Sequence, residues 1–128
     1  MRAEPVAPSP LGIMIHPDYG LWHGYRGALA IPDRLPLPPR EGRPAPCASC
    51  TERPCLAACP VGAFADGRYD VETCADWLRS SHGTDCLTKS CAARRACPVG
   101  RDHAYAPDQA EFHMRAFLAA REPTEACR

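Results

Sequence analysis

The chain has 128 residues, including 15 prolines and 9 glycines, and its 15 basic and 15 acidic side chains give a formal net charge of zero. This length predicts a single domain, and so much proline excludes a fold built mostly of regular helix or sheet. The balanced charge argues against a nucleic-acid or anionic-membrane surface. No run approaches the roughly 20 apolar residues of a membrane span, and no signal peptide opens the chain, so we expect a cytoplasmic protein.

The first part of the chain, residues 1–46, is predicted to be an N-terminal arm with a β-hairpin and a proline-rich linker. Residues 1–10 carry three prolines and few apolar side chains, which predicts an extended or disordered arm. A short strand over residues 11–15, a turn at His16-Pro17-Asp18-Tyr19-Gly20 and a second strand within residues 21–31 form the predicted hairpin. Residues 32–46 hold six prolines, which is typical of a linker or a surface loop.

The second part, residues 47–128, carries two predicted helices. Asp70 is expected to cap a helix from about Val71 to Ser80, which places Cys74, Trp77 and Leu78 on one face. A second helix is predicted from Pro107 to about Arg121, with Pro107 at its first position, Asp108 and Glu111 in its first turn and Pro123 ending it. Its apolar face consists of Ala110, Met114, Phe117 and Leu118. Together with the hairpin, these helices predict a small, loop-rich α+β fold.

Eight of the nine cysteines form two arrays that each end in Cys-Pro-Val-Gly. The first array is Cys47, Cys50, Cys55 and Cys59, and the second is Cys74, Cys86, Cys91 and Cys97. Closely spaced thiolates closed by Cys-Pro are typical of [4Fe–4S] clusters, and in the cytosol such cysteines are more often metal ligands than disulfides. The arrays therefore predict two [4Fe–4S] clusters and electron transfer. No catalytic acid, base or nucleophile is recognisable, so we do not expect an enzyme.

The proline of each Cys-Pro is expected to start a single helical turn. In two-cluster ferredoxins, the cysteine before this proline ligates the other cluster. This crossed pattern assigns Cys47, Cys50, Cys55 and Cys97 to cluster one, and Cys59, Cys74, Cys86 and Cys91 to cluster two. Cys127 lies outside both arrays and is expected to be a free thiol.

Residues 47–64 run from Cys-Ala-Ser-Cys to Cys-Pro-Val-Gly-Ala-Phe and resemble a bacterial-type ferredoxin motif. The lone Cys74 and the segment from Pro17 to Trp22 are similar to the ferredoxin-like half of epoxyqueuosine reductases and reductive dehalogenases. The resemblance covers roughly residues 11–100 and implies a ferredoxin-like dicluster domain that relays single electrons between redox protein partners. The spacing Cys86-x4-Cys91-x5-Cys97 is wider than in those families, and their cobalamin-binding catalytic half has no counterpart in this sequence.

Two other functions remain open. The chain is alternatively the electron-input module of a multi-part reductase whose catalytic half is a separate chain. It is alternatively a zinc-stapled interaction module, although zinc favours paired Cys-x2-Cys knuckles and only Cys47 and Cys50 form one.

Four side chains near the second array also have two interpretations each. Trp77 shields cluster two from water or is plain core, and His82 replaces a ligand or is a solvated loop residue. Arg94 and Arg95 bind an acidic partner or a cluster sulfur, or are a solvated pair.

Overall fold

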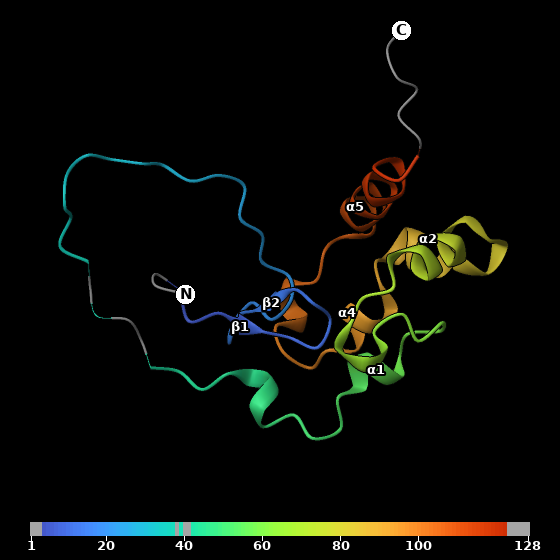
Figure 1. The fold of residues 1–128 in the computed structure, drawn as a ribbon, viewed down its shortest axis with the longest axis horizontal. Helices are drawn as coiled ribbons and strands as arrows, with labels where there is room; N and C mark the ends of the chain where they lie inside the picture. The colour runs from blue at the N-terminus through green and yellow to red at the C-terminus, as the bar shows by residue number, and fades with distance from the viewer. Residues whose placement is uncertain (1–3, 38, 40–41, 123–128) are drawn as a thin grey trace, which may run out of the picture.

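The computed structural model describes residues 4–37, 39 and 42–122. Within these ranges the chain forms five α-helices, four 3-10 helices and one antiparallel sheet of two strands. This mixture agrees with the predicted α+β class. Figure 1 shows the helices gathered in one half of the molecule, the small sheet beside them, and a long loop that leaves the sheet and returns before α1. Pro123, the predicted helix stop, and Cys127 lie outside the described residues.

The hairpin lies earlier in the chain than the sequence predicts. Strand β1 (Ala7–Pro8) pairs with β2 (Met14–Ile15), with Ala7 opposite Ile15 and Pro8 opposite Met14. The described part of residues 1–10 is therefore partly extended, as predicted, but it packs onto the rest of the protein rather than forming a separate arm, and the Val6 side chain is buried. Pro8 is compatible with this pairing because each strand of a two-stranded sheet is an edge strand.

The predicted second strand within residues 21–31 is wrong. His16 and Gly20 close a tight turn with hydrogen bonds of 2.8 and 2.9 Å between their backbones, and Leu21 and Trp22 then enter the core. Beyond them the chain is exposed, and the Leu29 side chain keeps 96% of its accessible surface. Gly24 and Gly27 within this stretch and Pro32 directly after it disfavour a strand. The described residues of the predicted linker continue the same exposed loop up to the 3-10 helix at Pro46.

Five short or medium helices carry the rest of the chain: α1 (Pro54–Ala57), α2 (Val71–Arg79), α3 (Thr84–Lys89), α4 (Ala92–Ala96) and α5 (Pro107–Ala119). The predicted cap of α2 is confirmed, because the Thr73 amide donates to Asp70 Oδ1 at 3.0 Å. The predicted start of α5 is also confirmed, with Pro107 in its first turn. None of the helices in the described residues is both long and apolar enough to cross a membrane.

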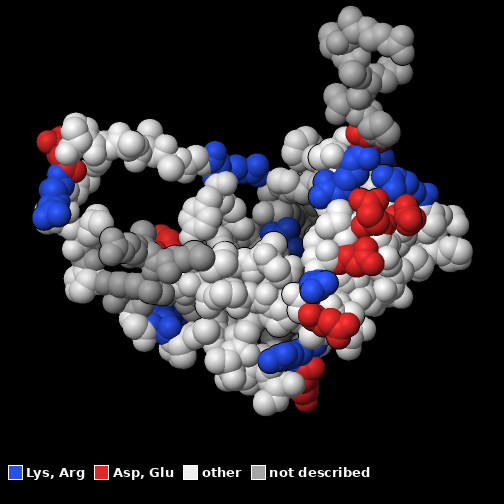
Figure 2. Space-filling view, viewed as in Figure 1, with Lys and Arg blue, Asp and Glu red and all other residues white. Residues whose placement is uncertain are grey.

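Charged side chains are locally balanced over the helical half. Figure 2 shows basic and acidic residues next to one another on the face in view. Exposed ion pairs within single helices join Asp76 to Arg79, Asp85 to Lys89 and Glu111 to Arg115. Such exposed pairs contribute about 0–1 kcal/mol each, so they are not what holds the helices in place.

One hydrophobic core joins the N-terminal segment to the helices that carry cysteines. It consists of Leu11, Ile15, Leu21, Cys55, Phe64, Ala93 and Cys97. Helix α1 packs against α4, and α3 packs against α5. The N-terminal segment therefore supports the cysteine region directly.

Both Cys-Pro-Val-Gly segments form turns rather than the predicted helical turn that starts at proline. Each turn ends on a glycine in the left-handed region, with φ of 61° at Gly62 and 70° at Gly100. A 3-10 helix follows each turn: η2 (Ala65–Gly67) and η4 (Arg101–His103). The prediction therefore differs from the structure, in which Gly100 is the N-cap of η4 and Phe64, two residues after Gly62, is the N-cap of η2.

Gly100 also fixes the N-terminal turn against this region. A Cβ atom on Gly100 would lie 2.3 Å from the carbonyl carbon of Tyr19, and a Cβ on Gly20 would lie 2.0 Å from the Val99 oxygen. The two backbones can approach this closely only because both residues are glycine.

Candidate metal centres

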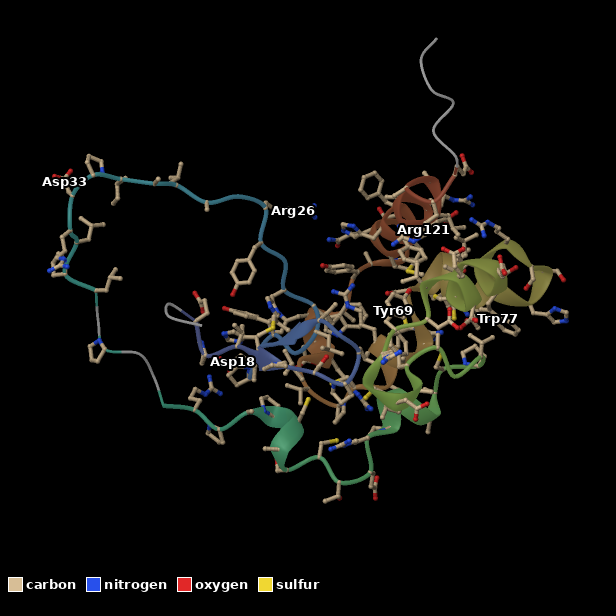
Figure 3. The ribbon with its side chains drawn as sticks, viewed as in Figure 1. Asp18, Arg26, Asp33, Tyr69, Trp77 and Arg121 are labelled. Carbon is tan, nitrogen blue, oxygen red and sulfur yellow. The ribbon has the colours of Figure 1, made fainter. Side chains whose placement is uncertain are left out.

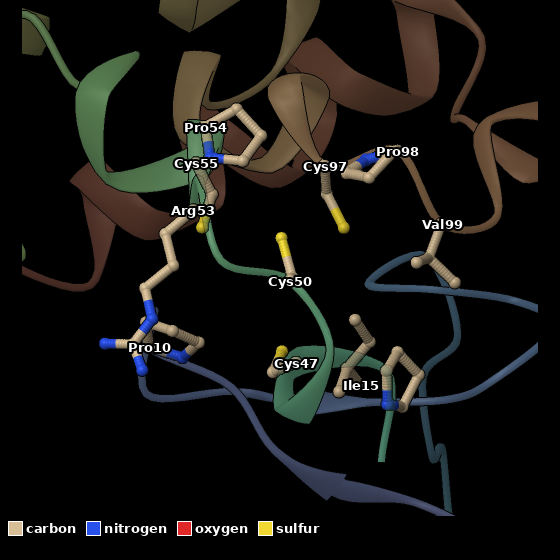
Figure 4. Close-up of a pocket in the computed structure, with 11 residues that line it drawn as sticks. Pro10, Ile15, Cys47, Cys50, Arg53, Pro54, Cys55, Cys97, Pro98 and Val99 are labelled. Atoms are coloured by element: carbon tan, nitrogen blue, oxygen red, sulfur yellow. The ribbon is translucent and has the colours of Figure 1, made fainter. Parts of the chain in front are cut away.

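The first candidate centre is a cavity lined by Cys47, Cys50, Cys55 and Cys97. These residues come from the 3-10 helix η1 (Pro46–Ala48), the loop after it, α1 and the end of α4. The space between the lining atoms is about 340 Å³ when the open side is included. Figure 4 shows the sulfur atoms of Cys50 and Cys97 directed toward each other across this space. The other lining residues are Pro10, Ile15, Pro46, Arg53, Pro54, Pro98 and Val99.

The second candidate centre is a similar cavity lined by Cys59, Cys74, Cys86 and Cys91. Its volume is about 310 Å³, again with the open side included. Its remaining lining is largely aliphatic and aromatic: Pro60, Val61, Phe64, Trp77, Leu78, Ala92, Ala93 and Met114. Helix α2 presents Cys74, Trp77 and Leu78 to this cavity together, as their spacing predicts.

Packing of α1 against α4 explains how the eight cysteines divide between the cavities. Cys55 lies in α1 and Cys59 just after it, while Cys91 precedes α4 and Cys97 follows it. Each helix, together with the residues at its ends, thus presents one cysteine to each cavity. The resulting groups contain the same residues as the crossed assignment, and the role of these residues as ligands stays a prediction.

The thiols within each cavity influence one another. Burial raises the pKa of Cys47, and the neighbouring Cys97, Cys55 and Cys50 raise it further. Burial likewise raises the pKa of Cys74, with smaller contributions from Cys59 and Cys86 in the same cavity. Four thiolates in such surroundings need a positive charge among them, and a bound metal supplies it while deprotonating the thiols.

Within the described residues, no three or more His, Cys, Asp or Glu side chains converge closely enough to hold a single metal ion. The four thiols of each group instead surround a cavity. Their chemistry and their apolar surroundings fit a group that is larger than one ion and takes four sulfur ligands.

Backbone strain accompanies two of the cysteines. Arg53, two residues before Cys55, has a φ of 44°, and Ser90, directly before Cys91, has a φ of 74°. Ser90 is also buried. Residues other than glycine adopt these conformations at a cost of about 1–3 kcal/mol, and such strain is frequent at functional sites.

Sequence reasoning missed two contacts to cysteine sulfur at the second cavity. The Ala63 amide donates to Cys59 Sγ at 3.3 Å. The Tyr69 side chain lies close enough to the Cys74 thiol to oppose the burial that raises the pKa of that thiol. Ala63 acts through its backbone and so leaves no mark in the sequence. The presence of Tyr69 five residues before Cys74 was visible, but its orientation was not.

The arginines of α4 are engaged within the protein. Arg94 Nε donates to the Leu21 carbonyl at 2.8 Å, and its guanidinium lies over the rings of Trp22 and Tyr105, at 4.4 and 4.6 Å from their centroids. Arg95 pairs with Asp85 and donates to the Ser90 carbonyl at 3.2 Å. The prediction of a solvated loop pair is therefore wrong, since both residues lie on a helix and stabilise the fold.

His82 lies beside the second cavity without lining it. Its ring stacks on Trp77, with centroids 5.9 Å apart and planes at 26°. It belongs to the 3-10 helix η3 (Ser81–Gly83) rather than to the predicted loop.

No protein-family model, curated protein or solved structure matches this chain. The resemblance to ferredoxins therefore rests on the cysteine motifs and the segment from Pro17 to Trp22, and it stays a prediction.

Proposed function

We propose that this protein is a ferredoxin-like electron carrier that relays single electrons between redox proteins through two [4Fe–4S] clusters. The observation that carries the proposal is the division of eight cysteines between two cavities of similar volume, four to each. Four thiolates drawn from separate segments are the donor set of a cubane cluster. In this proposal, Cys47, Cys50, Cys55 and Cys97 hold the first cluster, and Cys59, Cys74, Cys86 and Cys91 hold the second.

When bound, such clusters accept and release single electrons without a change in covalent bonding at the protein. The remaining task falls to the chain. Its cysteines bind the clusters. The apolar lining of each cavity limits the access of water to the bound cluster, and this tunes the reduction potential of that cluster. Because α1 and α4, with the residues at their ends, each present one cysteine to each group, the packing of these two helices keeps the two groups next to each other.

The composition of the holo-protein tests this function. Protein purified and reconstituted anaerobically is expected to bind about eight iron and eight sulfide per chain, as two four-iron clusters require. It is expected to be brown and to give an electron paramagnetic resonance signal after reduction. Stoichiometric zinc without sulfide would overturn the proposal in favour of a structural module, and four iron per chain would reduce it to one cluster.

The crossed assignment has its own test. Cys97→Ser is expected to damage the site that also contains Cys50, and Cys59→Ser the site that also contains Cys86. Cys50→Ser and Cys86→Ser supply reference spectra for the loss of each site, and Cys127→Ser is the control that changes neither. If Cys59→Ser instead reproduces the Cys50→Ser spectrum, each array closes its own cluster and the assignment is wrong.

A further inference from the structure

The two cavities differ in the side chains that can donate hydrogen bonds to sulfur. Four of the residues that line the first cavity are prolines, which have no amide hydrogen to donate: Pro10, Pro46, Pro54 and Pro98. Ile15 and Val99 offer no side-chain donor either. Arg53 is the exception, but it is exposed, and Figure 4 shows its guanidinium directed toward Pro10 and away from Cys50 and Cys97. Its charge does lower the pKa of the Cys47 thiol, but by less than burial and the neighbouring thiols raise it, since solvent screens an exposed charge.

Two aromatic side chains with donors lie at the second site, Trp77 in the wall of the cavity and Tyr69 beside it. The Tyr69 hydroxyl is close enough to the Cys74 thiol to oppose the burial that raises the pKa of that thiol. Its ring stacks on Phe64, with centroids 4.8 Å apart and planes at 13°. Trp77 lines the same cavity from α2. Figure 3 shows both aromatic residues in the helical half of the molecule.

Trp77 carries a polar atom without a partner. Its Nε1 is buried and makes no hydrogen bond within the described part of the chain. An unpaired buried donor is unfavourable by about 1–3 kcal/mol. Because the indole borders a cavity that four thiols surround, sulfur bound there is the acceptor that would satisfy it.

Backbone donors do not produce this difference, since they occur at both sites. At the first site, the amides of Leu56 and Cys55 favour the thiolate of Cys55 and counteract the burial that raises its pKa. At the second site, the amides of Arg94 and Ala93 act in the same way on the pKa of Cys91. The Ala63 amide also donates to Cys59 Sγ there, at 3.3 Å. The contrast between the cavities therefore lies chiefly in the side chains of Tyr69 and Trp77.

We propose that Tyr69 and Trp77 donate hydrogen bonds to sulfur at the second site and make it the higher-potential site of the two. This inference rests on the proposed function. Reduction adds negative charge to a cluster, and a hydrogen-bond donor stabilises the more negative state, which raises the reduction potential. The first electron that the protein accepts therefore reduces the second site, and the first site has the lower reduction potential. Tyr69 and Trp77 act as positioning and tuning residues, not as ligands.

Redox titration of the anaerobically purified holo-protein, followed by electron paramagnetic resonance, tests this order. In the wild type, the signal that Cys86→Ser removes is expected to appear first as the potential is lowered. Tyr69→Phe and Trp77→Phe keep the rings and remove the donors. Each is expected to make the reduction potential of the second site more negative. At a fixed applied potential, the ratio of oxidised to reduced second site is expected to rise about tenfold, which corresponds to a shift of about 59 mV for one electron. The first site is expected to keep its potential.

Trp22→Phe is the matched control, because Trp22 Nε1 is also buried without a partner among the described residues, yet Trp22 lines neither cavity. It is expected to shift neither potential. Unchanged potentials in both Tyr69→Phe and Trp77→Phe, with full iron and sulfide, would overturn this inference alone. Earlier reduction of the first site in the wild type would do the same. Absence of sulfide in the wild type would instead overturn the proposed function.

Discussion

Gly62 and Gly100 occupy equivalent positions in the two Cys-Pro-Val-Gly turns, but the structure places different demands on them. Both have a left-handed backbone, with φ of 61° and 70°. A Cβ atom on Gly62 would have no heavy atom within 4 Å, whereas one on Gly100 would lie 2.3 Å from the Tyr19 carbonyl carbon. The first position needs glycine for conformation only, and the second needs it for conformation and for space.

Alanine at these two positions separates the conformational effect from the steric one. Gly62→Ala is expected to lower the free energy of unfolding by about 1–2 kcal/mol, the penalty of a left-handed residue with a side chain. Gly100→Ala adds overpacking against the Tyr19 backbone, which cannot move away as a flexible side chain could. It is expected to lower the free energy of unfolding by roughly 2–5 kcal/mol in total. Thermal unfolding of the two variants measures this difference. Equal losses would mean that the contact between Gly100 and Tyr19 relaxes freely.

Among the secondary-structure elements, α2 bears most directly on the second site, because it carries Cys74 and Trp77. Its first turn is held by Asp70, which accepts hydrogen bonds from the Thr73 amide at 3.0 Å and the Thr73 hydroxyl at 2.8 Å. These bonds also lower the pKa of the Asp70 carboxyl. The cap therefore determines where the helix begins and how Cys74 meets the other thiols.

Replacement of this cap is expected to weaken the second site before the first. Asp70→Ala removes both acceptors and is expected to lower the melting temperature and speed loss of iron from the second site to a chelator. Asp70→Asn keeps an acceptor for the Thr73 amide and is expected to remain close to wild type. Glu72→Ala, an exposed change in the same turn, is the control. Equal iron loss from both sites in Asp70→Ala would contradict a local role for the cap.

The sequence predicted those elements whose ends carry their own signals. Asp70 and Pro107 mark the starts of α2 and α5 by capping and by a fixed φ, which are local effects. Helices α1, α3 and α4 have four to six residues, too few for a hydrophobic period to appear. The hairpin was misplaced because β1 is two residues long and contains Pro8, so its pairing with β2 depends on tertiary contacts.

The candidate site divides in the same way between local and tertiary information. Spacing singled out the eight cysteines as candidate ligands, because cysteines a few residues apart in sequence are also close in space. The grouping around two cavities depends on the packing of α1 against α4, and its prediction was taken from a known pattern rather than from these residues. Donors such as Tyr69 and the Ala63 amide were missed because sequence does not specify which polar groups face sulfur.

At the scale of the whole molecule, the exposed loop connects two parts that are already held together by packing. Leu11, Ile15 and Leu21 share a core with Cys55 and Cys97. Arg94 binds the Leu21 carbonyl. At the far end of the loop, Arg43 pairs with Asp18 through bonds of 2.5 and 2.8 Å. The loop is therefore not needed to keep the N-terminal segment in place.

Limited trypsin digestion tests this independence. The first cuts are expected after Arg26 and Arg34, because both are exposed and lie outside helices and strands. The nicked protein is expected to elute as one species in gel filtration, with its iron retained, and to separate only in denaturant, since the buried contacts of the N-terminal segment do not involve the loop. Arg34→Gln is expected to remove one of the two cuts without changing stability. Release of the N-terminal piece from the nicked protein without denaturant would contradict this expectation. It would show that the core and the Arg94 contact are too weak to hold the piece. The covalent connection through the loop would then be what maintains the fold around the first cavity.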